Sequence, residues 1–363
     1  MPLRIENLVY GGNGLAREND FVWFVPYSAP GDLLDIEKTD VKTSYGRGKI
    51  SRIIESSALR TDPPCPLFGR CGGCQWQHIR YPAQLAAKQE IIGSMAKRNL
   101  MNPPSSVIIQ PSPSEWEYRC RISLHRQDRK IGYHAIGSRN LVAIRDCPIA
   151  EAPLRSWLEN PPLSKLELEA LPERFELRNK DGTVRIVHAA ADEAFEQANR
   201  QGNTLLRNRL REHLLNSFSN PRIFDLFCGD GNLSLPLTDT AESIDGWDIS
   251  AGAIERARTA AASNSNLNYS RGNVSAIYGE LRRKSREIDI LILDPPRKGI
   301  KKEAPELAKL GIPLIAYVSC NPASLIRDLK EFEKAGYTLN VLEAFDMFPQ
   351  TYHMECLALL SAE

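Results

Sequence analysis

Short apolar stretches separated by glycine-rich turns fill the first 58 residues. The predicted strands cover residues 4–10, 20–26, 33–38 and 48–54. Turn-forming residues separate them, as in Gly11-Gly12-Asn13-Gly14. Several short strands in so few residues fit a small β-barrel of the oligonucleotide-binding (OB) type. We therefore expect residues 1–58 to form an OB-like barrel, which either binds RNA or only packs against its neighbour.

The next segment, residues 59–194, changes character several times. Residues 59–81 contain many prolines and glycines and predict irregular chain. Apolar positions then recur at helical spacing and predict a helix over 82–99, with Pro82 in its first turn. Strand-like stretches follow at 118–126, 130–134 and 141–145. We interpret 59–194 as a central α+β domain, and the helix as an element that could pack on a later domain.

From residue 223 onward, short apolar strands alternate with amphipathic helices. This rhythm predicts a doubly wound, Rossmann-like parallel sheet, and we assign 195–363 to it. The late strands at 339–344 and 356–360 could form an antiparallel end of that sheet. The predicted strands are 223–227, 243–248, 288–293 and 312–318, and the predicted helices are 251–264 and 322–335. The fold class expected for the whole chain is multidomain α/β.

Charge is spread unevenly along the chain, although the net charge of the 363 residues is only +1. Residues 59–155 carry 14 basic and 7 acidic side chains, whereas the flanking segments are acidic. A basic segment of this kind favours contact with a polyanion such as RNA. The sequence has no apolar run long enough to span a membrane and no apolar signal core at its start. We therefore expect a cytoplasmic protein without a membrane partner. We also expect the protein to be a monomer.

A glycine-rich turn follows the strand predicted at 223–227, in the run Asp225-Leu-Phe-Cys-Gly-Asp-Gly-Asn232. Glycines at such a turn let the backbone approach a ligand closely. The run lacks the third glycine of the dinucleotide fingerprint, which favours S-adenosylmethionine over a nicotinamide. Asp248 ends the next predicted strand, where an acid can accept both ribose hydroxyls of an adenosine. A tight structural turn without a ligand is the alternative.

Three side chains in the last 70 residues could support covalent chemistry on a pyrimidine ring. Cys320 and Asp294 each follow a predicted buried strand, and the carboxyl ends of parallel strands share one edge of a sheet. A thiolate can add to carbon 6 of uracil, which turns carbon 5 into a nucleophile for a methyl group. A base, for which Glu355 is the candidate, must then remove the carbon 5 proton. Taken alone, Cys320 could equally be a buried core thiol.

Four of the eight cysteines indicate a metal site. Cys65, Cys71 and Cys74 lie close together in the sequence, and Cys147 is a more distant candidate fourth ligand. Four thiols suit either zinc or a cubane iron–sulfur cluster, and a cluster of thiols without metal is the third possibility. Cys120 is the rival for the fourth position.

These motifs together resemble those of the RNA uridine-5-methyltransferase family over residues 190–360. The matching runs are Phe195-Glu-Gln197-Ala-Asn, the glycine-rich turn, Asp294-Pro-Pro-Arg297-Lys-Gly, Ser319-Cys320-Asn-Pro and Phe348-Pro-Gln-Thr-Tyr-His-Met-Glu355. The resemblance implies Cys320 as nucleophile and Glu355 as base. It implies contacts with S-adenosylmethionine or the target base from Gln197, Phe227, Asn232, Asp248, Asn273 and Asp294. Asp248 stands where the family more often has glutamate.

The run Cys71-Gly-Gly-Cys74-Gln-Trp-Gln77 resembles the iron–sulfur subgroup of the same family. That resemblance implies a [4Fe–4S] cluster held by Cys65, Cys71, Cys74 and Cys147, with a structural role. The layout of barrel and cluster resembles members that modify 23S ribosomal RNA, and transfer RNA is the alternative substrate. A non-catalytic RNA-binding factor and an iron–sulfur redox protein remain as functions of other classes.

The basic segment suggests where RNA could be held. Arginines and lysines alternate there with Trp116, Tyr118 and Tyr133, and unpaired RNA is commonly bound by phosphate pairing together with aromatic stacking. We expect this segment and the barrel to grip a folded RNA loop, from which the target base leaves its stack. The basic residues concerned are Arg119, Arg121, Arg126, Arg129, Lys130, Arg139 and Arg145.

Overall fold

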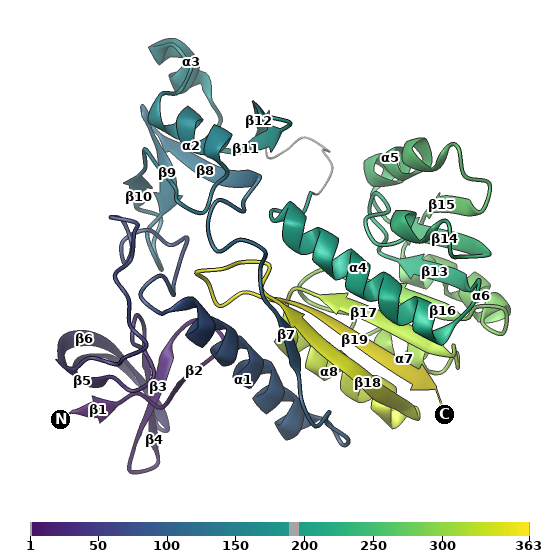
Figure 1. Cartoon of the computed structure of the whole chain (residues 1–363), viewed down its shortest axis with the longest axis horizontal. Coiled ribbons are helices and arrows are strands. Elements are labelled where there is room, and N and C mark those ends of the chain that lie inside the picture. The colour runs from purple at the N-terminus through teal and green to yellow at the C-terminus, as the bar shows by residue number, and fades with distance from the viewer. Residues whose placement is uncertain (1, 189–195, 363) are drawn as a thin grey trace.

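The computed structural model describes residues 2–188 and 196–362, which form three β-sheets joined by helices (Figure 1). Phe195, part of one predicted motif, and the predicted boundary at 194 and 195 lie outside the described residues. Within the described part, no helix combines the length and apolar character needed to cross a membrane.

The N-terminal sheet is a small barrel-like unit, as predicted. Its strand order is β1-β5-β6-β4-β3-β2, with β4 and β6 parallel and the other neighbours antiparallel. Trp23 and Leu34 lie in its small core. Gly46 is required there, because a Cβ atom at this position would lie 2.4 Å from the Trp23 ring. The strands are β1 (Leu3–Arg4), β2 (Asn7–Leu8), β3 (Gly14–Glu18), β4 (Phe21–Val25), β5 (Leu33–Val41) and β6 (Tyr45–Glu55).

The central sheet has five antiparallel strands in the order β10-β9-β8-β11-β12. Alternate residues of β8, Ile122 and Leu124, face a core that also contains Phe175 and Leu177 of β11. Two helices, α2 (Ala152–Glu159) and α3 (Lys165–Ala170), belong to this region, and α3 begins at a capping box formed by Ser164 and Glu167. The strands are β8 (Arg121–Gln127), β9 (Lys130–His134), β10 (Leu141–Ala143), β11 (Arg174–Lys180) and β12 (Thr183–His188).

The C-terminal sheet has eight strands in the order β15-β14-β13-β16-β17-β19-β18-β7. The first five are parallel, and β19 is antiparallel to both of its neighbours, as the late strands suggested. The strands are β7 (Ile108–Gln110), β13 (Arg222–Leu226), β14 (Ser243–Asp248), β15 (Leu267–Arg271), β16 (Ile290–Leu293), β17 (Leu314–Ser319), β18 (Tyr337–Phe345) and β19 (Glu355–Ala362).

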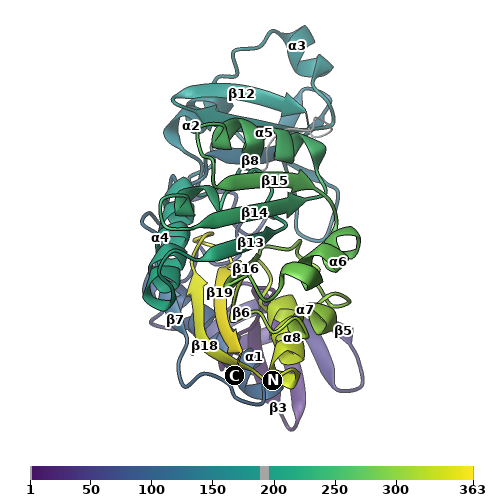
Figure 2. The ribbon, with the colours of Figure 1, turned by 90° about the vertical axis from the view of Figure 1, so that its right-hand side faces the viewer.

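Helices cover both faces of this sheet, so its central strands are apolar throughout (Figure 2). In β16, Leu291 and Leu293 join the core beneath α1, α6, α7 and α8, whereas Ile290 and Ile292 join the core beneath α4. The helices are α1 (Tyr81–Asn99), α4 (Arg200–Ser217), α5 (Ala251–Ala261), α6 (Val274–Lys284), α7 (Ala304–Ala308) and α8 (Pro322–Lys334), with a 3₁₀ turn at Leu235–Leu237.

The helix predicted over 82–99 packs on the later domain, as we expected it could, and β7 also belongs to the C-terminal layer although its position placed it in the central domain. Helix α1 contacts α8, β18 and β7, and β7 pairs in parallel with β18 (Figure 1). The range 59–194 is therefore not one structural unit. The sequence analysis predicted one strand over 4–10, where the structure has the two short strands β1 and β2. It missed further elements, because short strands and polar helices depend on tertiary packing for their definition. The missed elements are β3, β7, β11, β12, β15, α2, α3, α4, α6 and α7.

Candidate active site

The ends of β16, β17 and β19 bring the predicted catalytic residues together. Asp294 follows the last residue of β16, and Cys320 follows the last residue of β17. Glu355 is the first residue of β19, which runs antiparallel to β17 with Ser319 opposite Cys356. One residue further along this register, Cys320 and Glu355 come to the same edge of the sheet. The nucleophile and base candidates are thus neighbours, although 35 residues separate them in the sequence.

These groups lie close enough to shift one another's ionisation. Burial raises the pKa of Cys320 to about 11, and the nearby Glu355 carboxylate adds to that rise, whereas Arg297 opposes it. Burial and the Asp294 carboxylate raise the pKa of Glu355 well above its ordinary value. Burial raises the pKa of Asp294 to about 7, with Asp248 as a further cause. The site therefore favours neutral acids over carboxylates, and Arg297 is the cation that opposes this tendency.

The loop after β16 is fixed to the start of α8. The backbone carbonyl of Arg297 accepts hydrogen bonds from Asn321 Nδ2 (3.0 Å) and Ser324 Oγ (2.9 Å). Gly299 has φ +69, and a Cβ atom there would lie 2.2 Å from Asp328 Oδ2. Arg297 also contacts His353 through Nη2 and Nδ1 at 3.3 Å. The Arg297 backbone thus fixes the Asp294 loop, and its exposed guanidinium lies near Cys320.

The segment that leads to Glu355, residues 346–354, is held by α1. Lys88 and Asp346 form a fully buried ion pair, and Lys88 Nζ also donates to the Phe348 carbonyl (3.2 Å). Gln84 and Gln350 exchange two hydrogen bonds of 2.9 Å each. Sequence analysis missed this bracing because 266 residues separate the two glutamines.

The glycine-rich turn after β13 is shaped as a ligand-binding turn. Phe227, Gly229 and Gly231 all have positive φ values, of 64°, 57° and 86°. The Gly229 amide donates to Asp248 Oδ2 at 3.1 Å, so the predicted ribose acceptor is tied directly to the turn. Asn232 exchanges hydrogen bonds with Asn203 of α4, at 2.8 and 3.1 Å.

A cavity of about 550 Å³ opens beside this turn. Its lining includes two predicted cofactor residues, Gln197 and Asn232, together with Asn203 and Asp230, which the sequence analysis did not select. Asn273, also predicted to bind cofactor, caps α6 by accepting a hydrogen bond from the Ala276 amide (2.8 Å). No signal in the sequence singled out Asn203, which becomes relevant only through its contact with Asn232.

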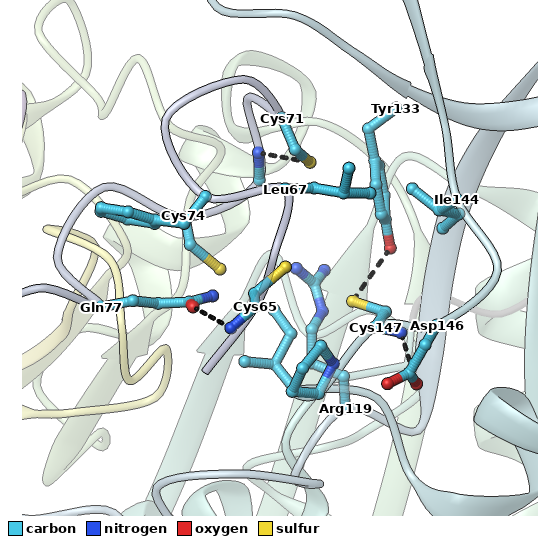
Figure 3. Close-up of a pocket in the computed structure, with 14 residues that line it drawn as sticks. Cys65, Leu67, Cys71, Cys74, Gln77, Arg119, Tyr133, Ile144, Asp146 and Cys147 are labelled. Atoms are coloured by element: carbon cyan, nitrogen blue, oxygen red, sulfur yellow. Dashed lines mark hydrogen bonds between the residues drawn. The ribbon is translucent and has the colours of Figure 1, made fainter. Parts of the chain in front are cut away.

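The four predicted metal-ligand cysteines line one cavity of about 40 Å³ (Figure 3). Gly73 N donates to Cys71 Sγ at 3.4 Å, and the Tyr133 hydroxyl donates to Cys147 Sγ at 3.8 Å. Burial raises the pKa of Cys71 to about 11 and that of Cys74 to about 12. The rival Cys120 does not line the cavity, and its thiol donates to the Gln197 carbonyl at 3.3 Å.

The same cavity carries no group of three or more His, Cys, Asp or Glu side chains arranged to hold a metal ion, and neither does the rest of the described chain. The [4Fe–4S] cluster therefore stays a prediction. Its support is that four thiols from two distant segments share one cavity, which also includes the Arg119 side chain.

The prediction that Arg119 and Arg121 contact RNA is corrected by their environment. Arg119 lines the cysteine cavity and lies over the Phe348 ring, 5.9 Å from its centroid. Arg121 pairs with Glu176, with 18% of its side chain exposed. Among the interleaved aromatic residues, Tyr118 is buried and its hydroxyl donates to the Pro349 carbonyl (3.0 Å), whereas Trp116 and Tyr133 are half-buried. Other basic residues of the segment do face solvent: Arg129, Lys130, Arg139 and Arg145.

The strand order and the ligand turn define the fold of a Rossmann-like methyltransferase. Comparison with known proteins agrees: residues 165–363 match the tRNA (Uracil-5-)-methyltransferase family, and residues 1–51 match the TRAM domain. The chain belongs to the RNA uracil-5-methyltransferase family, carries an N-terminal TRAM domain, and is an enzyme. This membership overturns the two alternative functions, a non-catalytic RNA-binding factor and a redox protein. S-adenosylmethionine is the methyl donor of this class of enzyme.

Relatives and a solved structure match nearly the whole chain. An uncharacterized RNA methyltransferase of Bdellovibrio bacteriovorus is 32% identical, covering 100% of this chain and 95% of the relative. The 23S rRNA (uracil(1939)-C(5))-methyltransferase RlmD of Shewanella denitrificans is 29% identical over 99% of this chain and 95% of its own. The structure of Pyrococcus abyssi tRNA (uracil-54, C5)-methyltransferase with S-adenosyl-L-homocysteine superimposes with a TM-score of 0.73 at 23% identity, covering 99% of this chain and 100% of that one.

Proposed function

We propose that this enzyme methylates carbon 5 of a uridine in structured RNA through a covalent adduct with Cys320. The observation that carries the proposal is the register of β17 and β19, which brings Cys320 and Glu355 to one edge beside Asp294. A bound S-adenosylmethionine would supply an electrophilic methyl group. Gln197, Phe227, Asn232, Asp248 and Asn273 are the residues proposed to hold it.

The proposed steps assign one task to each side chain. The Cys320 thiolate forms a bond to carbon 6, and the electron pair of the carbon 5–carbon 6 double bond moves into an enolate. Asp294 accepts or donates a hydrogen bond at the ring edge. After carbon 5 has taken the methyl group, the ionised form of Glu355 removes the proton from carbon 5 and becomes the neutral acid, which its burial favours. The double bond then re-forms, and the bond between carbon 6 and sulfur breaks.

Ribosomal RNA of the large subunit is the substrate we favour. Its support is the naming of RlmD relatives that match 99% of the chain. Transfer RNA is the second candidate, because the matching family is described as tRNA (Uracil-5-)-methyltransferase.

The test uses RNA in which uridine is replaced by 5-fluorouridine. Fluorine at carbon 5 blocks proton removal, so a covalent complex should accumulate with S-adenosylmethionine and can be located by mass spectrometry of the protein. A 23S fragment and a transfer RNA pool are offered in parallel, and the trapped RNA is sequenced. Methylation of ordinary RNA without any Cys320 adduct would refute the covalent route.

We further propose that Cys65, Cys71, Cys74 and Cys147 hold a [4Fe–4S] cluster that orders the surrounding loops. The shared cavity supports it, as does the nearby Arg119 cation, which suits a group with net negative charge. Iron and sulfide analysis of protein purified without oxygen tests this, with Cys147→Ala expected to lose the cluster and Cys120→Ala to keep it. Stoichiometric zinc without iron would replace the cluster by a structural zinc site.

A further inference from the structure

The N-terminal barrel reaches the catalytic edge through one loop. Residues 9–13 join β2 to β3, and this turn is closed by the Gly12 amide donating to the Val9 carbonyl (3.0 Å). The Gly12 carbonyl in turn accepts a hydrogen bond from Trp76 Nε1 at 3.0 Å. Trp76 is fully buried, so the loop is anchored to the body of the protein.

The anchored loop presents Tyr10 to the residues around the nucleophile. The Tyr10 and Tyr352 rings meet edge to face, with centroids 5.4 Å apart. Tyr352 also lies against His353, with centroids 4.1 Å apart, and His353 contacts Arg297. The loop backbone also approaches Tyr352 closely, because a Cβ atom on Gly12 would lie 3.0 Å from the Tyr352 ring.

The electrostatic environment places the same ring near the reacting groups. Burial raises the pKa of Tyr10, and the Arg297 guanidinium beside it opposes that rise. Cys320 is also close enough to contribute. Tyr10, Tyr352 and Cys320 all remain half-buried, and Arg297 is exposed. An aromatic pair thus stands beside an accessible nucleophile and a cation.

We propose that Tyr10 contacts the extruded target nucleotide, forming with Tyr352 an aromatic wall that holds the uracil ring against Cys320. This inference rests on the proposed uridine methylation. An unstacked base readily takes an aromatic partner, since every base has a π-face. The TRAM domain would then complete the catalytic pocket, beyond any role in RNA affinity.

The aromatic requirement can be separated from simple packing with three variants. Tyr10→Phe keeps the ring, Tyr10→Leu keeps apolar bulk without a ring, and Tyr10→Ala removes both. Loss of one base–aromatic contact is expected to lower kcat/KM for RNA about 5- to 150-fold. Tyr10→Phe should retain most activity, and Tyr10→Leu should lose nearly as much as Tyr10→Ala. A purely structural role would instead let leucine rescue.

Tyr45 provides a matched control in the same domain. It lies on β6, is 38% exposed, and packs against Phe24 rather than against the catalytic edge. The measured quantity is the rate of adduct formation on 5-fluorouridine RNA at saturating RNA, together with the RNA dissociation constant. Tyr10→Leu should slow adduct formation at saturating RNA. Tyr45→Leu should leave that rate unchanged, so that any effect it has is confined to the RNA dissociation constant.

The outcomes separate this inference from the proposed function. If the unsubstituted enzyme forms the adduct and Tyr10→Leu forms it at the same rate and affinity, Tyr10 does not contact the nucleotide. If the unsubstituted enzyme forms no adduct while methylating ordinary RNA, the covalent route itself fails. In that case the kcat/KM values for ordinary RNA still decide the role of Tyr10, and equal values for all variants would overturn it.

Discussion

The Cys320 thiol and the thiols of the cysteine cavity both have a pKa raised by burial, but their neighbours differ. Burial raises the pKa of Cys320 to about 11, and it raises that of Cys71 to the same value. The surroundings distinguish them. Cys320 follows a strand end, beside two carboxyl groups and a guanidinium, whereas Cys71 shares a cavity with three other cysteines. The pKa of a thiol therefore does not identify a nucleophile here; its neighbours do.

The two regions are also joined. Arg119 of the cysteine cavity lies over Phe348, and the Tyr118 hydroxyl donates to Pro349. Both contacted residues belong to the segment that leads into Glu355. Disturbing the cavity should therefore reach the active site through residues 346–354, whereas disturbing Cys320 should leave the cavity intact.

The largest expected effect separates Cys320 from the other buried thiols. Cys320→Ala should abolish the adduct and lower methylation by about 10³-fold or more, because the proposed activation of carbon 5 depends on the Cys320 thiolate. Its melting temperature should not change, and neither should its content of the iron that we propose for the cysteine cavity. Cys356→Ala is the matched control, since Cys356 is fully buried beside the same strand pair but faces the core. If methyl transfer fell equally in both variants, Cys320 would not differ from a core thiol such as Cys356, and its proposed role as nucleophile would be wrong.

Glu355→Gln should show the second half of the catalytic cycle. Glutamine is isosteric with glutamic acid but cannot remove the carbon 5 proton, so turnover should fall about 10²- to 10⁴-fold. A covalent adduct should then accumulate with ordinary uridine RNA, which is detectable as a band resistant to denaturant. An adduct that fails to accumulate, with turnover preserved, would assign the base to another residue.

A substitution at Lys88 tests how strongly residues 346–354, which contact both the cysteine cavity and the candidate active site, depend on the buried ion pair. Lys88→Met leaves Asp346 buried without its cation, which typically costs about 3–5 kcal/mol. Unfolding in denaturant should show a loss of this size. The double variant Lys88→Met/Asp346→Leu should recover most of it, because both buried charges are then removed. A single variant within about 1 kcal/mol of the unsubstituted protein would show that Asp346 is stabilised by other means.

The meeting of Cys320 and Asp294 at one edge of the sheet was predictable because both residues lie at strand ends. Cys320 and Asp294 directly follow strands buried on both faces, and such apolar runs are readable from sequence. Parallel strands then bring these ends together without further information. Glu355 was placed by resemblance, and its position beside Cys320 depends on the antiparallel register of β17 and β19.

The contacts between distant segments were not predictable. Tyr118 and Arg119 lie in a basic, aromatic stretch whose pattern predicts an exposed surface. In the structure, Arg119 lines the cysteine cavity and the Tyr118 hydroxyl donates to the Pro349 carbonyl. Tyr10 carries no signal of its own in the N-terminal domain. The role that we propose for Tyr10 depends on its contact with Tyr352, some 340 residues later in the sequence. Local pattern cannot encode such pairings, since tertiary packing decides them.

The smallest expected effect concerns Arg297 and the pH dependence of attack. A thiol with a raised pKa is mostly protonated near neutral pH, so the rate of adduct formation should rise with pH. Arg297 lowers the pKa of Cys320 by favouring the thiolate. Arg297→Gln should therefore raise that pKa and move the profile to higher pH. A shift of one unit would slow attack about tenfold at neutral pH.

The measurement is the trapping rate on 5-fluorouridine RNA as a function of pH. This substrate is useful because fluorine blocks the proton removal assigned to Glu355. The trapping rate therefore does not depend on how well Glu355 accepts that proton. Arg297→Lys keeps a cation and should lie between the two profiles. If Arg297→Gln only weakens RNA binding, its profile at saturating RNA will overlay that of the unsubstituted enzyme. Arg297 would then serve as an RNA contact, and the contrast between Cys320 and the cavity thiols would rest on the carboxyl groups alone.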